Sequence, residues 1–121
     1  MIDNAILVID DDLAILDLIA ELLGYEGYQV ITCRSGRDAL LQAKDHTPAV
    51  ILLDLMMPEM SGWQVISALR SMPQTCSIPV VLLSARRDLA ATAKELDVAH
   101  FLEKPFDLDE LLELVQQYVL Q

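Results

Sequence analysis

The segment VILLDLMMPEMSG, residues 50–62, places an aspartate at the end of an apolar run. Residues 49–54 are continuously apolar up to Asp54, a pattern typical of a strand that is covered on both faces of a parallel sheet. Pro58 and Gly62 follow, and they end the strand and shape the next loop. Because burying a carboxylate is costly, an aspartate at this point is solvated, paired or used in chemistry.

Four other short runs, rich in apolar and β-branched residues, also predict strands. With the run above, the expected strands cover residues 5–9, 28–33, 49–54, 79–84 and 99–103. The runs 28–33 and 99–103 are more mixed in polarity, so we expect them nearer the edges of the sheet.

Amphipathic segments alternate with these strands and predict helices. They cover residues 13–27, 35–46, 61–72, 88–97 and 107–120. Ser35, Asp88 and Asp107 are expected at helix starts, and Gly24 or Gly27 at the end of the first helix. Five strand–helix repeats predict a single doubly wound α/β domain, (βα)5, over residues 1–121. A parallel sheet of five strands commonly has the order 2-1-3-4-5.

Composition and charge limit the functions that this chain can have. The 121 residues are 54% apolar, which favours one globular domain, and the formal charge is −11. An acidic surface repels phosphate backbones, so we expect no direct nucleic-acid binding. The sequence has neither a secretory signal nor an apolar stretch long enough to span a bilayer, so we predict a cytoplasmic protein with no membrane partner.

Polar side chains follow four of the predicted strands. Asp10 and Asp11 follow the first strand, Asp54 ends the third, Ser84 ends the fourth and Lys104 follows the fifth. Parallel strands bring their carboxyl ends to one edge, where two carboxylates about 4 Å apart repel by about 4 kcal/mol at an effective dielectric near 20. A hard divalent cation such as Mg²⁺ relieves this repulsion, and a carboxylate is also a competent nucleophile for a phosphoryl group.

Four short motifs resemble those of the receiver domain of two-component response regulators, and the resemblance covers essentially the whole chain. They are LVIDD (7–11), LLDLMMPEMSG (52–62), LLSA (82–85) and FLEKPF (101–106). The resemblance implies a flavodoxin-like fold and the function of a phosphorylation-dependent signalling switch rather than an enzyme.

The resemblance also assigns the phosphoacceptor and the metal ligands. Asp54 is expected to accept a phosphoryl group from a phosphohistidine of a histidine kinase or a histidine phosphotransfer domain. Asp10, Asp11, Asp54 and the backbone carbonyl of Met56 are expected to hold Mg²⁺, Asp11 most directly. Asp12 is better explained as a helix cap.

Three further residues are expected to change position on phosphorylation. The hydroxyl of Ser84 and the ammonium of Lys104 would meet the phosphoryl group, and Phe101 would turn inward. The expected result is a change in the face built from the fourth helix, fifth strand and fifth helix, which a downstream effector domain or protein would read. A homodimer through the same face is one expected assembly.

The sequence departs from the usual receiver pattern at a few positions. Asp97 and Val98 stand where Gly-Ala is usual, so Asp97 is expected at a positive φ. Ser84 replaces the commoner Thr, and Phe101 replaces Tyr. The Lys104–Pro105 bond is expected to be cis. The resemblance also implies that Met56 and Arg86 occupy positions that tune dephosphorylation in receiver domains, which leaves the lifetime of the phosphoryl group open.

Two other function classes are weighed against the switch. A Mg²⁺-dependent phosphatase with an aspartyl nucleophile would need a second acid two residues after Asp54, where Met56 stands. A nucleotide- or flavin-binding module would need a glycine-rich phosphate loop, and the four glycines of this chain do not form one.

Overall fold

The computed structural model describes residues 5–85 and 89–119. The predicted roles of Arg86 and of Asp88 as a helix start lie outside the described residues. Within them, strands and helices alternate from β1 to α5, as the sequence predicts.

Five parallel strands form one sheet with the order β2-β1-β3-β4-β5, which confirms the predicted topology. The strands are β1 (Ile6–Ile9), β2 (Val30–Cys33), β3 (Val50–Asp54), β4 (Val80–Ser84) and β5 (His100–Glu103). The two runs of mixed polarity, β2 and β5, lie at the edges, and β3, which ends in Asp54, lies in the centre. Each observed strand begins one or two residues later than predicted.

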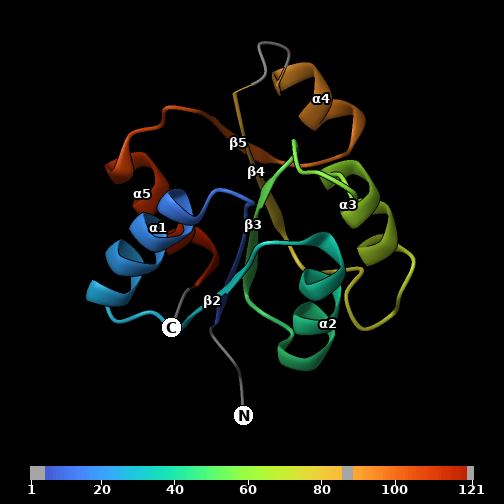
Figure 1. The fold of residues 1–121 in the computed structure, drawn as a ribbon, viewed down its shortest axis with the longest axis horizontal. Helices are drawn as coiled ribbons and strands as arrows, with labels where there is room; N and C mark the ends of the chain where they lie inside the picture. The colour runs from blue at the N-terminus through green and yellow to red at the C-terminus, as the bar shows by residue number, and fades with distance from the viewer. Residues whose placement is uncertain (1–4, 86–88, 120–121) are drawn as a thin grey trace.

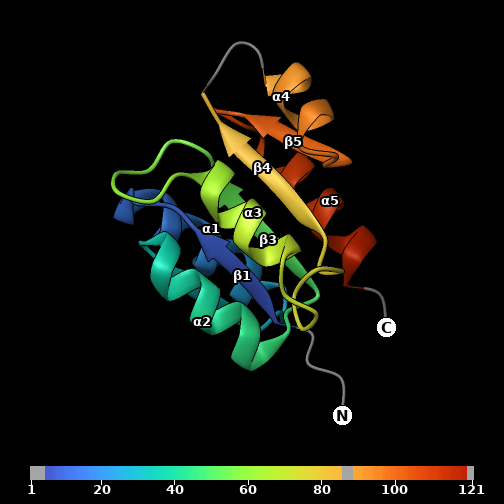
Figure 2. The same ribbon diagram turned by 90° about the vertical axis from the view of Figure 1, so that its right-hand side faces the viewer.

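Five helices cover the sheet on both faces (Figures 1 and 2). They are α1 (Leu13–Tyr25), α2 (Gly36–His46), α3 (Gly62–Arg70), α4 (Leu89–Glu95) and α5 (Leu108–Tyr118). Figure 1 shows α1 and α5 on one side of the strands, and α2, α3 and α4 on the other. Within the described part of the chain, none of these helices combines the length and the apolar character that a bilayer crossing requires.

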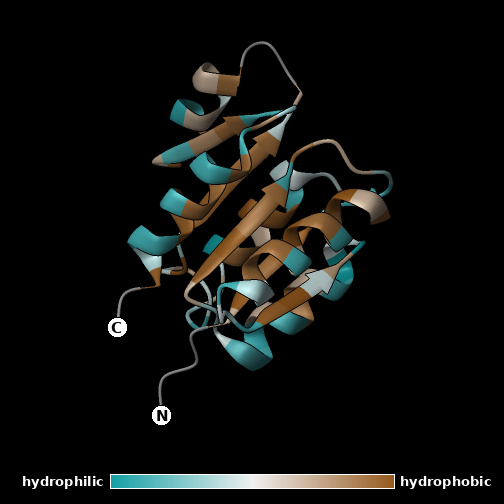
Figure 3. Ribbon diagram, turned by 90° about the vertical axis from the view of Figure 1, so that its left-hand side faces the viewer, coloured by the Kyte–Doolittle hydropathy of each residue, from teal (hydrophilic) through white to brown (hydrophobic). Residues whose placement is uncertain are grey.

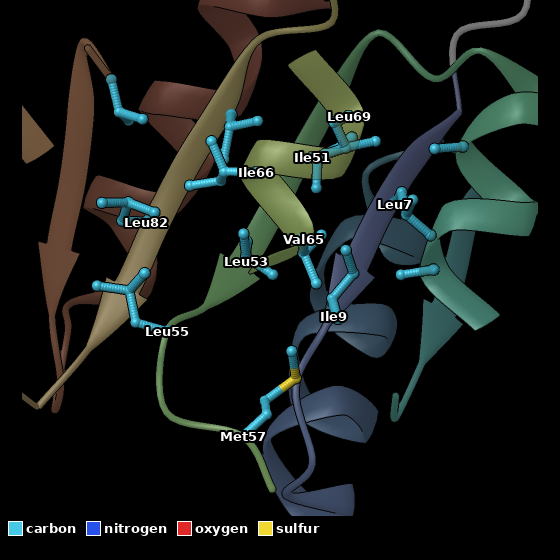
Figure 4. Packing of buried hydrophobic residues seen from close by; sticks show 14 of the residues in the cluster. Leu7, Ile9, Ile51, Leu53, Leu55, Met57, Val65, Ile66, Leu69 and Leu82 are labelled. Carbon is cyan, nitrogen blue, oxygen red and sulfur yellow. The ribbon is translucent and has the colours of Figure 1, made fainter. Parts of the chain in front are cut away.

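Each face of the sheet packs a separate apolar core, because successive strand residues point to opposite faces. Leu7, Ile9, Ile51 and Leu53 point toward α2, α3 and α4, whose buried side chains pack against them (Figure 4). The alternate residues of β1 and β3 pack against α1 and α5. The central strands are therefore hydrophobic along their length (Figure 3), which explains their unbroken apolar runs.

Side-chain caps fix the starts of four helices. Asp12 and Asp107 accept hydrogen bonds from backbone N–H groups two residues later, as expected of Asp12. Ser35 caps α2, and Ser61 caps α3 in a reciprocal box with Gln64. These caps begin each helix directly after a strand-end loop, so they fix the path of the chain next to those loops.

Two predicted boundaries are corrected by the structure. Helix α1 continues through Gly24 to Tyr25, and Gly27, at φ 93°, makes the turn that follows. Helix α3 ends at Arg70, because Thr75 folds back and donates its hydroxyl to the carbonyl of Leu69. Asp97 lies at φ 56°, as expected.

Candidate functional site

Three charged residues meet at the carboxyl edge of the sheet on the side covered by α1 and α5. Asp10, Asp54 and Lys104 each lie two residues after a strand residue of the α1–α5 core: Val8, Leu52 and Leu102, respectively. The two-residue period of a strand directs all three to the same side of the sheet. Residues distant in the sequence are therefore brought together by the strand order.

Lys104 binds Asp10 most directly. Its Nζ lies 2.7 Å from Oδ2 of Asp10, whose side chain is fully buried, and 3.7 Å from Oδ2 of Asp54. The other oxygen of Asp10, Oδ1, accepts the backbone N–H of Asp12 at 2.9 Å. The buried carboxylate of Asp10 is thus compensated on both oxygens, as a buried charge requires.

Asp54 is buried but less well compensated. Its Oδ1 accepts one hydrogen bond from a backbone N–H, that of Met56 at 3.2 Å, and Asp54 as a whole is 4% exposed. Burial, with the charge of Asp10 as the second cause, raises the pKa of Asp54 from 3.8 to about 6; Lys104 and the N–H of Met56 oppose this shift. At pH 7 the side chain is therefore a basic carboxylate that is still mostly ionised.

The three carboxylates that were predicted as metal ligands converge. Asp10, Asp11 and Asp54 each offer an oxygen, and these oxygens all lie within 4.8 Å of one another. A Mg²⁺ ion placed between two of these oxygens, with bonds of about 2.1 Å to each, would nearly span that separation. Carboxylate oxygens are also the hard ligands that Mg²⁺ prefers. The oxygens of Asp10 have closer partners, at 2.7 and 2.9 Å, than those of Asp54, at 3.2 and 3.7 Å, so Asp54 is the more available ligand of these two.

Ser84 and Phe101 lie together on the opposite side of the sheet, toward α4. Phe101 pairs in register with Leu82, two residues before Ser84, and packs half-buried against the core under α2, α3 and α4. Ser84 is fully buried at the end of β4. Its carbonyl accepts the N–H of Lys104 at 2.8 Å, so the ends of β4 and β5 are fastened next to the acidic cluster.

The loop after Asp54 depends on Gly62. A Cβ at this position would lie 2.7 Å from the Cα of Leu55 and 2.9 Å from the carbonyl oxygen of Asp54. The N–H of Gly62 also donates to the carbonyl of Leu55 at 3.0 Å. The glycine predicted to shape this loop is thus required by close backbone approach, and it fixes the start of α3 against the end of β3.

A shallow apolar groove adjoins the cluster on the α1 side. Its volume is about 410 Å³, and Ile15 and Leu18 of α1, Lys104 and the following residues Pro105, Phe106 and Leu108 line it, together with Ala85. Leu18 is 49% exposed and Leu13 51% exposed. The Lys104–Pro105 bond is cis, as expected.

The sequence reasoning missed two features of the site. It predicted Asp10 as a metal ligand but did not predict the ion pair in which Lys104 lies 2.7 Å from Asp10. It also omitted Arg34, whose Nη2 donates to the carbonyl of Asp11 at 3.4 Å. Arg34 could have been proposed from the sequence, because it is a basic residue directly after β2, the strand that neighbours β1.

The chain belongs to the response regulator receiver domain family, whose sequence model matches residues 6–116. The four motifs and the fold therefore identify a domain of two-component signalling. Its relatives are signalling proteins rather than classical enzymes.

Curated relatives carry this domain in proteins of different length. The chain is 42% identical over 109 residues to transcriptional regulatory protein KdpE of Mycobacterium tuberculosis, covering 88% of this chain and 47% of that protein. It is 29% identical over 119 residues to sporulation initiation phosphotransferase F of Bacillus subtilis, covering 98% and 96%. The chain thus spans about half the length of the first relative and nearly all of the second.

Solved structures share the fold closely. Chemotaxis protein CheY4 of Vibrio cholerae superposes with a TM-score of 0.85 at 29% identity, covering 94% of this chain and 97% of that one. A putative response regulator from Chloroflexus aurantiacus gives a TM-score of 0.87 at 28% identity, covering 96% and 97%. Both confirm the predicted fold class.

Proposed function

We propose that the chain is a phosphorylation-dependent switch domain, residues 1–121, in which Asp54 accepts a phosphoryl group. The observation that carries the proposal is the convergence of Asp54 with Asp10, Asp11 and Lys104 at the carboxyl edge of the sheet. A buried carboxylate of raised basicity, with a cation beside it, is suited to attack an electrophilic phosphorus.

The transfer would be a displacement at phosphorus. An Oδ atom of Asp54 attacks the phosphorus of a phosphohistidine on a histidine kinase or a histidine phosphotransfer domain. The new P–O bond forms as the P–N bond breaks, and its electron pair returns to the imidazole nitrogen of the donor. The product is an aspartyl phosphate, stabilised by charges that are already in place.

The same residues suit Mg²⁺, which would neutralise phosphoryl oxygens when bound. Asp11 and Asp54 would be the leading ligands, with Asp10 and the backbone carbonyl of Met56 beside them. Lys104 would hold the phosphoryl group by charge, once it exchanges part of its contact with Asp10 for the new anion. These assignments are proposals for each residue.

Ser84 and Phe101 would carry the signal away from Asp54. A phosphorylated Asp54 adds roughly −1.5 to −2 charges at pH 7, which favours a shift of the Ser84 hydroxyl toward the phosphate. Because Phe101 lies on the same side of the sheet as Ser84, that shift would let Phe101 turn further inward. The face formed by α4, β5 and α5 would then change its population of states.

Phosphoryl incorporation tests the acceptor. We expect the protein with Mg²⁺ and acetyl phosphate to gain one phosphoryl group by intact mass, and Asp54→Asn to gain none. Asp17→Asn, at an exposed aspartate of α1, is the matched control and should be labelled normally. Labelling of Asp54→Asn at the normal rate would place the acceptor elsewhere.

The apolar groove between α1 and the loop after β5 is the proposed docking site of the phosphodonor protein. It is continuous with the phosphoacceptor site, because Lys104 lines the groove and lies 3.7 Å from Asp54. A donor that brings a phosphohistidine to Asp54 must rest on the surfaces around it, and the exposed Leu18 offers it an apolar contact.

A pair of leucine variants tests this docking site. Leu18→Gln should slow phosphotransfer from a histidine-phosphorylated donor at least tenfold more than it slows labelling by acetyl phosphate. Leu41→Gln removes a leucine of similar exposure from α2, on the other side of the sheet, and should slow neither reaction. Equal effects of Leu18→Gln on both donors would rule out docking at this groove.

The face formed by α4, β5 and α5 is the proposed output surface of the switch. The relative KdpE is named a transcriptional regulatory protein, so a downstream effector domain or protein is the expected reader of α4, β5 and α5. Direct nucleic-acid binding by these residues is disfavoured by the charge of −11.

A cytoplasmic location and a homodimer through the face formed by α4, β5 and α5 stay predictions. We do not propose the phosphatase, because no observation favours it.

A further inference from the structure

A second cation lies at the site, on the side opposite to Lys104. Cys33, the last residue of β2, pairs with Ile9 of β1, so Arg34 leaves the sheet beside Asp10. The N–H of Asp10 donates to the carbonyl of Cys33 at 3.1 Å, which fixes this pairing up to the strand ends. The guanidinium of Arg34 then reaches across to the carbonyl oxygen of Asp11, at 3.4 Å.

That contact leaves most of the guanidinium free. The acceptor is a backbone carbonyl, and no carboxylate pairs with Arg34 among residues 5–85 and 89–119. Arg34 is exposed, and a guanidinium has five N–H donors in a planar fork that matches phosphate oxygens. One anchored donor thus holds the group at the rim of the acidic cluster, while the others remain available to an anion.

We propose that Arg34 is a phosphodonor-binding residue, which binds the phosphoryl oxygens of the incoming donor and weakens Mg²⁺ binding at the same time. The inference rests on the proposed function of Asp54. Its physical basis is that one positive charge, held at the backbone carbonyl of Asp11 on the rim of the acidic cluster, attracts an anionic donor and repels a cation. Screening at physiological ionic strength acts over about 8 Å, so we expect both effects to weaken as the salt concentration rises.

Removal of the Arg34 charge should change Mg²⁺ binding and phosphorylation in opposite directions, so one variant tests both effects. Arg34→Gln should tighten Mg²⁺ binding about two- to tenfold, measured without phosphodonor by the fluorescence of Trp63, the only tryptophan. At saturating Mg²⁺, the same variant should lower the second-order rate of Asp54 phosphorylation by acetyl phosphate about two- to tenfold. A merely structural role would weaken both, because a distorted site binds neither ligand well.

Two further variants separate charge from geometry. Arg34→Lys keeps the positive charge but lacks the planar fork of the guanidinium. Its Mg²⁺ affinity should therefore match that of the unaltered protein, and its phosphorylation rate should lie between the rates of the unaltered protein and of Arg34→Gln. Arg37→Gln removes the same charge from the first turn of α2, where Arg37 lines a separate cavity with Pro58 and Glu59, and should change either quantity less than twofold.

The outcomes distinguish the inference from the proposed function. Equal effects of Arg37→Gln and Arg34→Gln, weaker Mg²⁺ binding in Arg34→Gln, or an unchanged phosphorylation rate in that variant would each overturn the role of Arg34 alone. Failure of the unaltered protein to take up a phosphoryl group at Asp54 would overturn the proposed function and the inference together.

Discussion

At the scale of single residues, Asp10 and Asp54 differ although both are buried carboxylates. Asp10 has the ammonium of Lys104 at 2.7 Å and a backbone N–H at 2.9 Å, whereas Asp54 has the same ammonium at 3.7 Å and one N–H at 3.2 Å. Burial, followed by the charge of Asp10, raises the pKa of Asp54 to about 6. Lys104 therefore compensates the charge of Asp10 more closely than that of Asp54.

The raised pKa predicts that Asp54 opposes folding at neutral pH. Between pH 4 and pH 6 the native state holds a proton that the unfolded chain has lost, so native stability falls as the pH rises through this range. Without Mg²⁺, Asp54→Asn should raise the free energy of unfolding at pH 7 by up to about 3 kcal/mol, since each pKa unit corresponds to about 1.4 kcal/mol.

Urea unfolding at several pH values checks this prediction. The gain from Asp54→Asn should shrink as the pH falls from 7 to 4, because the native protein then carries a neutral Asp54 as well. A gain that is constant with pH would mean that another effect of the asparagine, such as packing, is responsible.

At the scale of elements, the loop between β3 and α3 depends on the missing side chain of Gly62. Gly62→Ala places a methyl group against the backbone of Leu55 and Asp54, so the loop must move. We expect a loss of stability of about 1–3 kcal/mol, the usual cost of overpacking, and slower phosphorylation of Asp54. Thermal unfolding and acetyl phosphate labelling measure the two effects.

The matched control is a glycine within a helix. Gly24 of α1 has open space around its Cβ position, so Gly24→Ala should stabilise the protein by about 0.5–1 kcal/mol and leave labelling unchanged. If Gly62→Ala proved as harmless as Gly24→Ala, the close approach at β3–α3 would not constrain the site.

At the scale of the whole molecule, metal binding and folding are linked. The oxygens of the proposed Mg²⁺ ligands come from the ends of β1 and β3, which meet only in the folded sheet, so we expect Mg²⁺ to bind the native state and stabilise it. A Mg²⁺ concentration of 100 times the dissociation constant should add about 2.7 kcal/mol. The midpoint of thermal unfolding with and without Mg²⁺ measures this gain.

Two neighbouring aspartates separate metal binding from helix capping. Asp11→Ala should remove most of the Mg²⁺-dependent gain. Asp12→Ala removes the cap of α1 and should lower stability by about 1 kcal/mol, yet it should keep the Mg²⁺ effect. A full Mg²⁺ effect in Asp11→Ala would show that Asp11 is not a ligand.

Much of the fold of this protein can be predicted from local sequence. Unbroken apolar runs predicted strands buried on both faces, and the caps at Ser35 and Asp107 predicted helix starts, because both depend on neighbours in the chain. The motifs around Asp54 and Lys104 predicted two of the residues that meet at the edge of the sheet. Helix ends, such as that of α3 at Arg70, were less predictable, because the return of Thr75 to Leu69 decides where that helix stops.

The partners of the charged groups came only from the tertiary structure. Asp10 and Lys104 are 94 residues apart, and the sequence does not say that they pair more closely than Lys104 and Asp54 do. The placement of Arg34 beside Asp11 likewise follows from the register of β1 and β2. The sequence determines which chemical groups reach the edge of the sheet; distances set by strand order and register decide which charges pair, because the Coulomb energy depends on separation and burial.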